Sequence, residues 1–125
     1  MRLAAALFCA ASLPAPALAV EAVQPFAGEW VVDLSAKPGE VYTKPMVLSL
    51  NTDGTVTGSF YESGIEAGRW KTDRGRTCVS FRTTDGVGPY HTAACLVGDH
   101  VEGQTWAEQR KFLFNWNATR KTGDK

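Results

Sequence analysis

The sequence predicts an all-β protein, folded as an eight-stranded antiparallel up-and-down barrel with one disulfide. Apolar and polar residues alternate through most of the chain, which is the period of a β-strand, and no segment has the period of a helix. The 12 glycines and 6 prolines indicate many turns. These segments are 26–34, 42–50, 55–61, 65–71, 77–84, 90–97, 101–106 and 112–118. Eight antiparallel strands can close on themselves, which removes exposed edges and leaves an interior for side chains or one small ligand.

The first half of the chain carries the clearest hairpin signal. The first segment places Trp30, Val32 and Leu34 on one face before a Lys-Pro-Gly turn ends it. Pro45 in the second segment indicates an edge or a bulge, because proline cannot donate a ladder hydrogen bond. The Asp-Gly pair at 53–54 joins the second segment to the third, since these residues accept the positive φ of a tight turn.

Short turns separate the later segments, and they lie at 62–64, 73–75, 85–89 and 98–99. The fifth and sixth segments alternate cleanly, with Val79 and Phe81 on one face of the fifth. In the last segment Phe112, Phe114 and Trp116 share a face, and Trp116 is expected in the core. Consecutive short connections favour a meander of neighbouring hairpins over a more complex topology.

Two cysteines test this arrangement. If the hairpin around Val87 is symmetric, Cys78 faces Cys95 on the outer surface and Val79 faces Ala94 on the inner one. We therefore predict a Cys78–Cys95 disulfide with Cα atoms no more than about 7 Å apart. Such a bond would stabilise the fold by about 3 kcal/mol in the chain-entropy model and fix the register.

A metal site made by Cys78 and Cys95 with His91 and His100 is the alternative for these cysteines. The chain lacks the Cys-x(2–4)-Cys and His-x(3–5)-His spacings of zinc sites. The disulfide is therefore favoured, and no metal is expected.

The first 19 residues have the pattern of a secretory signal peptide. One positive charge at Arg2 precedes an apolar run over 3–13, and Ala17-Leu18-Ala19 supplies small residues before a predicted cleavage site after Ala19. A transmembrane anchor would need about 20 apolar residues. Lipidation of Cys9 is disfavoured because the bulky Phe8 precedes it.

Residues 20–125 are then expected to form one barrel domain, with a polar tail over 121–125. The predicted location is the periplasm or the medium outside the cell, where a disulfide persists. No second long apolar run exists, so no membrane insertion is expected after cleavage. The 13 basic and 13 acidic residues balance, which argues against a nucleic-acid partner.

Two short motifs resemble calycin barrels, the group that contains lipocalins and avidins. Gly28-Glu29-Trp30 looks like the G-x-W with which these barrels open, and the segment 53–60, DGTVTGSF, resembles the avidin hairpin D-G-x-x-T-G-x-Y. The resemblance covers about twenty residues. It implies a barrel of this size in which Trp30 plugs the closed end.

The resemblance does not extend to a biotin site. Val32 stands where avidins have a polar Asn or Thr, and Ser35 is out of register with their ligand-binding serine. Phe60 stands where avidins have a tyrosine, and Tyr61 faces the other side. The expectation is therefore an avidin-like or lipocalin-like shape without biotin recognition.

No catalytic motif is visible. His91 and His100 are the only side chains with an ordinary pKa near neutrality, and neither has a nucleophile beside it in the sequence. The chain has no G-x-S-x-G, no H-E-x-x-H and no glycine-rich phosphate loop. We expect neither an enzyme nor a cofactor.

The predicted function is that of an exported, non-enzymatic barrel that binds a small, partly apolar ligand. Tyr42, Phe60, Trp70 and Trp106 are the predicted ligand-binding residues, since aromatic rings give flat apolar walls. Plain packing of the barrel interior is the alternative role for such residues.

The alternative function is a secreted protein-binding module. Small secreted inhibitors of bacterial metalloproteases are similar in length and strand number, and the segment 21–25 could act as an inserting N-terminal arm, as could the loops. The partner is thus a small molecule or an extracytoplasmic protein. The sequence leaves the oligomeric state open.

Overall fold

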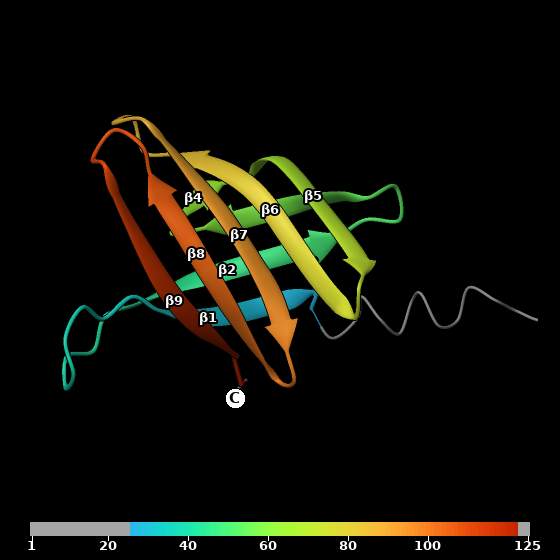
Figure 1. Ribbon diagram of the computed structural model, residues 1–125, viewed down its shortest axis with the longest axis horizontal. Coiled ribbons are helices and arrows are strands. Elements are labelled where there is room, and N and C mark those ends of the chain that lie inside the picture. The colour runs from blue at the N-terminus through green and yellow to red at the C-terminus, as the bar shows by residue number, and fades with distance from the viewer. Residues whose placement is uncertain (1–25, 123–125) are drawn as a thin grey trace, which may run out of the picture.

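The computed structural model describes residues 26–122, which form a closed antiparallel β-barrel without helices (Figure 1). The strands are β1 (Gly28–Asp33), β2 (Thr43–Leu50), β3 (Thr55–Phe60), β4 (Ser63–Gly64), β5 (Glu66–Asp73), β6 (Arg76–Thr84), β7 (Pro89–Val97), β8 (His100–Ala107) and β9 (Phe112–Arg120). The sheet order is β2-β1-β9-β8-β7-β6-β5-β3-β4, and an additional pairing of β2 with β3 closes it. The two-residue β4 pairs only with β3, so eight strands make up the barrel wall.

The predicted fold class is confirmed, and the strand boundaries differ from the expected ones by only a few residues. The first predicted segment begins at residue 26, whereas β1 begins at Gly28. Phe26 therefore precedes the strand, and it packs in the core beside Trp30. The short β4 was not expected. It lies where the chain turns at Tyr61 and Glu62, both of which have positive φ.

Alternation places one parity of residues inside along every strand. The neighbouring pairs Val79–Ala94, Ala94–Gly103 and Gly103–Trp116 form one inward row across β6, β7, β8 and β9. Gly103 in this row has no side chain because the indole of Trp116 occupies the space. A Cβ at that position would lie 2.3 Å from Cζ2 of Trp116.

The disulfide forms as predicted. Cys78 on β6 lies directly opposite Cys95 on β7, with Cα atoms 4.0 Å apart. The flanking pairs Val79–Ala94 and Phe81–Thr92 have the predicted register. Both members of the first pair and Phe81 belong to the buried core, so a one-residue slip would expose them.

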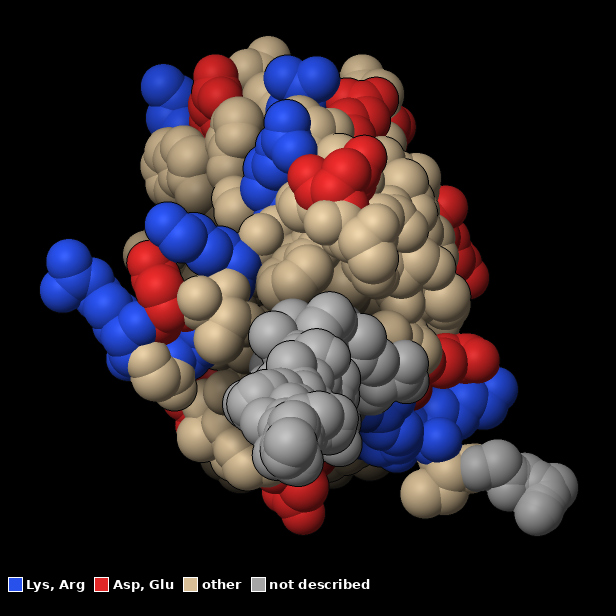
Figure 2. All heavy atoms as spheres, turned by 90° about the vertical axis from the view of Figure 1, so that its right-hand side faces the viewer, with Lys and Arg blue, Asp and Glu red and all other residues tan. Residues whose placement is uncertain are grey.

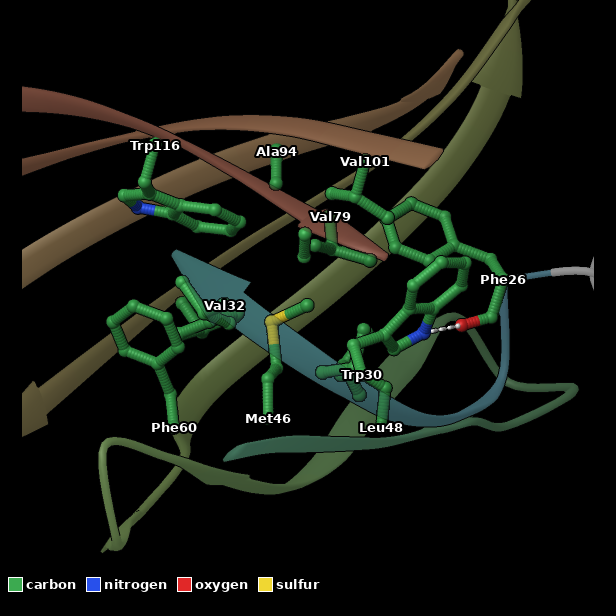
Figure 3. Close-up of a cluster of buried hydrophobic side chains, with 13 residues drawn as sticks. Phe26, Trp30, Val32, Met46, Leu48, Phe60, Val79, Ala94, Val101 and Trp116 are labelled. Atoms are coloured by element: carbon green, nitrogen blue, oxygen red, sulfur yellow. Dashed lines mark hydrogen bonds between the residues drawn. The ribbon is translucent and has the colours of Figure 1, made fainter. Parts of the chain in front are cut away.

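One end of the barrel is closed by Trp30. This indole is 1% exposed, donates a 2.9 Å hydrogen bond to the Phe26 carbonyl oxygen, and meets the Phe26 ring edge-on (Figure 3). The Arg120 guanidinium lies 4.2 Å from the centre of the Trp30 ring and donates to the Ala27 carbonyl oxygen. Gly28 has a φ of +116°, and a Cβ there would come within 2.7 Å of Arg120. These contacts make this end a packed plug.

Charged side chains of both signs lie on the face that Figure 2 shows. On that face Lys and Arg lie among Asp and Glu.

Some sequence predictions lie outside the described residues. These are the signal peptide 1–19 with Cys9, the segment 21–25 and the last three residues of the polar tail. Within 26–122, no helix is long and apolar enough to cross a membrane.

Candidate functional site: a cavity at the open end

The end of the barrel opposite Trp30 holds a cavity of about 500 Å³. The connections at this end are 34–42, 61–65, 85–88 and 108–111. The first, third and fourth of these lie towards the left of Figure 1, away from the hairpin at 51–54. The cavity lining comes from these connections and from the adjacent strand ends. It is therefore a mouth formed by several elements that are far apart in the sequence.

Small inward residues on three adjacent strands make room for the cavity. Thr83 on β6, Thr92 on β7 and Thr105 on β8 are each at most 2% exposed. Thr92 lies opposite both Phe81 and Thr105 in the barrel register. Since threonine is much smaller than the tryptophan and phenylalanine deeper in the barrel, this part of the wall leaves the interior unfilled.

Aromatic rings form much of the remaining wall. Phe60 packs with ring centroids 5.6 Å from Phe81 and 5.3 Å from Trp116, and these contacts separate the cavity from the packed core. Phe112 and Phe114 stack on each other at 5.4 Å on β9. Phe60, Phe112 and Phe114 all line the cavity, which gives it flat apolar surfaces.

Two tyrosines meet at the rim. The hydroxyls of Tyr42 and Tyr61 are hydrogen-bonded, and their rings meet edge-on at 6.3 Å. The Lys44 ammonium lies 5.1 Å from the Tyr61 ring centre and 3.7 Å from a Glu62 carboxylate oxygen. The hydrogen bond to Tyr42, followed by burial, raises the pKa of Tyr61 to about 12. The Tyr61 phenol is therefore neutral at physiological pH, and its hydrogen bond to Tyr42 ties two separate connections together.

A second polar cluster lies on the same rim. The Tyr90 hydroxyl donates to Asp85 at 2.8 Å and accepts from Arg110 Nε at 2.9 Å. A further Arg110 nitrogen lies 3.6 Å from the same Asp85 carboxylate. The hydrogen bond from Tyr90, the backbone N–H of Val87 and the charge of Arg110 lower the pKa of Asp85. The carboxylate and the guanidinium therefore neutralise each other at the cavity.

The buried threonines differ in their hydrogen bonds. The Thr105 hydroxyl oxygen accepts from Trp116 Nε1 at 3.0 Å and is hydrogen-bonded to the Thr92 hydroxyl at 2.8 Å. The Thr83 hydroxyl has no hydrogen-bond partner among residues 26–122, although Thr83 is only 2% exposed. Thr83 and Thr105 both line the cavity.

Of the four predicted ligand-binding residues, Tyr42 and Phe60 line the cavity. Trp70 packs against the core, and its Nε1 donates to the Asn51 carbonyl oxygen at 2.7 Å, beside the hairpin of the opposite end. Trp106 is 41% exposed on the outside of β8, between His91 and Leu113. The structure thus brings two of these aromatic residues together and places the other two elsewhere.

Alternation within β8 explains the position of Trp106. Val101 and Thr105 point inward, so Trp106 has the outward parity. The same parity rule assigns Thr83, Tyr90 and Phe112 to the interior, where sequence reasoning had not placed a site. Arg110 lies in a loop, and no periodic signal could have found it.

The histidines lie away from the cavity lining. His91 Nε2 is 2.8 Å from Glu108, and His100 Nε2 is 3.1 Å from Glu102, all of them on the outside or at turns. Among residues 26–122, no three His, Cys, Asp or Glu side chains gather in a way that could hold a metal ion. Cys78 and Cys95 are joined to each other.

No protein-family model, no curated protein and no solved structure matches the chain.

Proposed function

We propose that this protein is an exported, non-enzymatic barrel that holds a small, partly apolar ligand in its open end. The observation that carries the proposal is the cavity of about 500 Å³ at the end opposite the Trp30 plug. Ligand sites of small molecules are typically concave, mostly apolar and of roughly 300–1,000 Å³. A periplasmic or secreted location accords with the disulfide, because such bonds persist in oxidising compartments.

The composition of the lining supports binding over catalysis. Aromatic rings are prominent in the lining, while the polar side chains are hydroxyls, the Asn115 amide and the paired Asp85 and Arg110. This combination suits recognition, in which apolar walls give affinity and a few polar groups fix orientation. The calycin resemblance belongs to the same proposal, since barrels of that group hold ligands in one end.

Exposed apolar side chains at the same rim favour a second candidate, a protein-binding module. Val41 is 86% exposed, and Val87 and Phe112 are 46% and 47% exposed. Val41 and Val87 lie in connections at the end of the barrel that holds the cavity. Phe112, Tyr42 and Tyr61 line the cavity itself. Aromatic and apolar residues clustered on loops are typical of protein interfaces.

Native mass spectrometry of the protein purified from its own extracytoplasmic compartment tests both candidates. We expect a small molecule retained on the wild-type barrel. A Ser63→Trp variant should lose it, because Ser63 lines the cavity and a tryptophan there fills the mouth. The matched control is Ser49→Trp, at an exposed position of β2.

Retention of the same mass by both tryptophan variants would contradict the proposed site. If instead a protein co-purifies and is lost when Val41 and Val87 are changed to Ser, that result would favour the protein-binding module over the ligand site. Absence of any bound species would contradict both.

A further inference from the structure

Two hydroxyl hydrogens of the cavity's buried threonines have no acceptor among residues 26–122. One belongs to Thr83, whose hydroxyl makes no hydrogen bond. The other belongs to the pair of Thr92 and Thr105. Their shared hydrogen bond uses only one of their two hydrogens, and Trp116 donates to the pair without accepting. Whichever of the two threonines donates in this bond, the hydroxyl hydrogen of the other has no acceptor.

The unpaired hydroxyl hydrogens are donors, so the cavity lacks hydrogen-bond acceptors for them. A buried donor without an acceptor costs about 1–3 kcal/mol, and orphaned donors are rarer in proteins than under-used acceptors. A ligand that brings an acceptor oxygen relieves this deficit, whereas one that brings only donors adds to it.

The charged side chains at the cavity are already paired, which disfavours a charged ligand. Asp85 and Arg110 are the charged residues that line the cavity, and they are paired with each other and with Tyr90. Lys44, close to the rim, is paired with Glu62. A charged ligand would have to break one of these pairs or enter an apolar site without a counter-ion, at a desolvation cost.

We infer that the ligand is a neutral, flat, largely apolar molecule that presents a carbonyl-type oxygen to the Thr83 hydroxyl. This inference rests on the proposed function and adds the chemical class of the ligand. The stacked Phe112 and Phe114 and the ring of Phe60 supply the flat walls. Thr83 supplies the donor that orients the polar end. Where Thr92 donates to Thr105, the Thr105 hydrogen is available to a second acceptor, because Thr105 also lines the cavity.

Three naphthalenes of nearly the same shape test the inference. They are 2-acetylnaphthalene, which carries a neutral carbonyl, 2-ethylnaphthalene, which has no acceptor, and 2-naphthoate, which is an anion. Affinities are measured by fluorescence titration of the full, disulfide-bonded barrel. We expect the order acetyl, then ethyl, then naphthoate.

Thr83→Val isolates the hydroxyl, because valine keeps the shape of threonine. The variant should bind 2-acetylnaphthalene about fivefold more weakly, the fold-change of one net hydrogen bond, and 2-ethylnaphthalene as before. Its urea midpoint should not fall, since the lost hydroxyl has no hydrogen-bond partner among residues 26–122. Thr119→Val, at an exposed position of β9, is the matched control and should change neither affinity.

The outcomes separate this inference from the proposed function. Tight binding of both neutral naphthalenes with no effect of Thr83→Val would overturn the role of Thr83 and leave the ligand site intact. Preferred binding of 2-naphthoate would overturn the neutral class. If none of the three binds while native mass spectrometry still finds a small molecule that Ser63→Trp loses, the inferred ligand class is wrong and the proposed site stands.

Discussion

The two ends of this barrel are built from the same alternating strands and yet do opposite things. At the closed end, large inward side chains meet across the axis, and Trp30, Phe26 and Arg120 seal it. At the open end the inward positions of three adjacent strands are threonines, and a cavity of about 500 Å³ remains. Figure 3 shows the buried side chains of this core, with Trp30 and Phe26 together on one side and Phe60 and Trp116 on the other. Side-chain size at equivalent inward positions therefore decides where a barrel is core and where it is a site.

This comparison predicts that the closed end carries the stability. Trp30→Ala removes a buried indole, its hydrogen bond to Phe26 and the ring beneath Arg120. We expect the free energy of unfolding to fall by about 3–5 kcal/mol, as for other buried aromatic-to-alanine changes. Urea unfolding measures the loss, and a change below about 1 kcal/mol would show that Trp30 is not a structural plug.

The disulfide should have the next largest effect. Cys78 and Cys95 are 17 residues apart, so replacing both with Ser releases a loop of that size in the unfolded chain. The chain-entropy model gives a loss of about 3 kcal/mol. Comparing the oxidised wild type with the double variant by urea unfolding checks this value, and equal stabilities would contradict it.

At the open end we expect a substitution to change ligand affinity more than stability. Phe112 is 47% exposed, so Phe112→Ala should lower the free energy of unfolding by only about 1 kcal/mol. Affinity for 2-acetylnaphthalene should fall at least severalfold, because Phe112 lines the cavity. Leu113→Ala, on the neighbouring outward position and 53% exposed, is the control that should leave affinity unchanged. The comparison of the two ends breaks down if Phe112→Ala costs as much stability as Trp30→Ala.

The smallest effect concerns the tyrosine pair at the rim. The pKa of Tyr61 is raised to about 12, so its contribution to stability is complete below pH 10 and is lost as the pH rises from about 10 to 12. Titration of tyrosinate absorbance should show one of the 3 tyrosines ionising near pH 12. In Tyr42→Phe that pKa should move down towards 10, because the hydrogen bond to Tyr42 is its largest cause. An unchanged titration curve would place the two hydroxyls apart.

Sequence reasoning found the barrel because alternation and turns are local signals. The register of Cys78 with Cys95 followed from a single symmetric hairpin, and it is confirmed. The site was harder to find. Aromatic character alone points to Trp70 and Trp106, whereas the cavity lies where inward residues are small, as at Thr83 and Thr105.

Parity along β8 was available from the sequence and would have turned Trp106 outward. The cluster of Asp85, Tyr90 and Arg110 could not be predicted, since it depends on which loops meet at one end of the closed sheet. Likewise, only the positions of the surrounding residues show that the Thr83 hydroxyl has no hydrogen-bond partner within 26–122. Local sequence patterns thus specify the strands. The site depends on which strand ends and loops come together when the barrel closes.

The most direct test of the account is a methyl-resolved NMR titration with 2-acetylnaphthalene. We expect shifts at Leu34, Thr83 and Thr105, which line the open-end cavity, and none at the buried closed-end methyls of Leu48 and Val101. Shifts confined to the closed end or to outward methyls such as that of Val47, or no shifts at all, would contradict it.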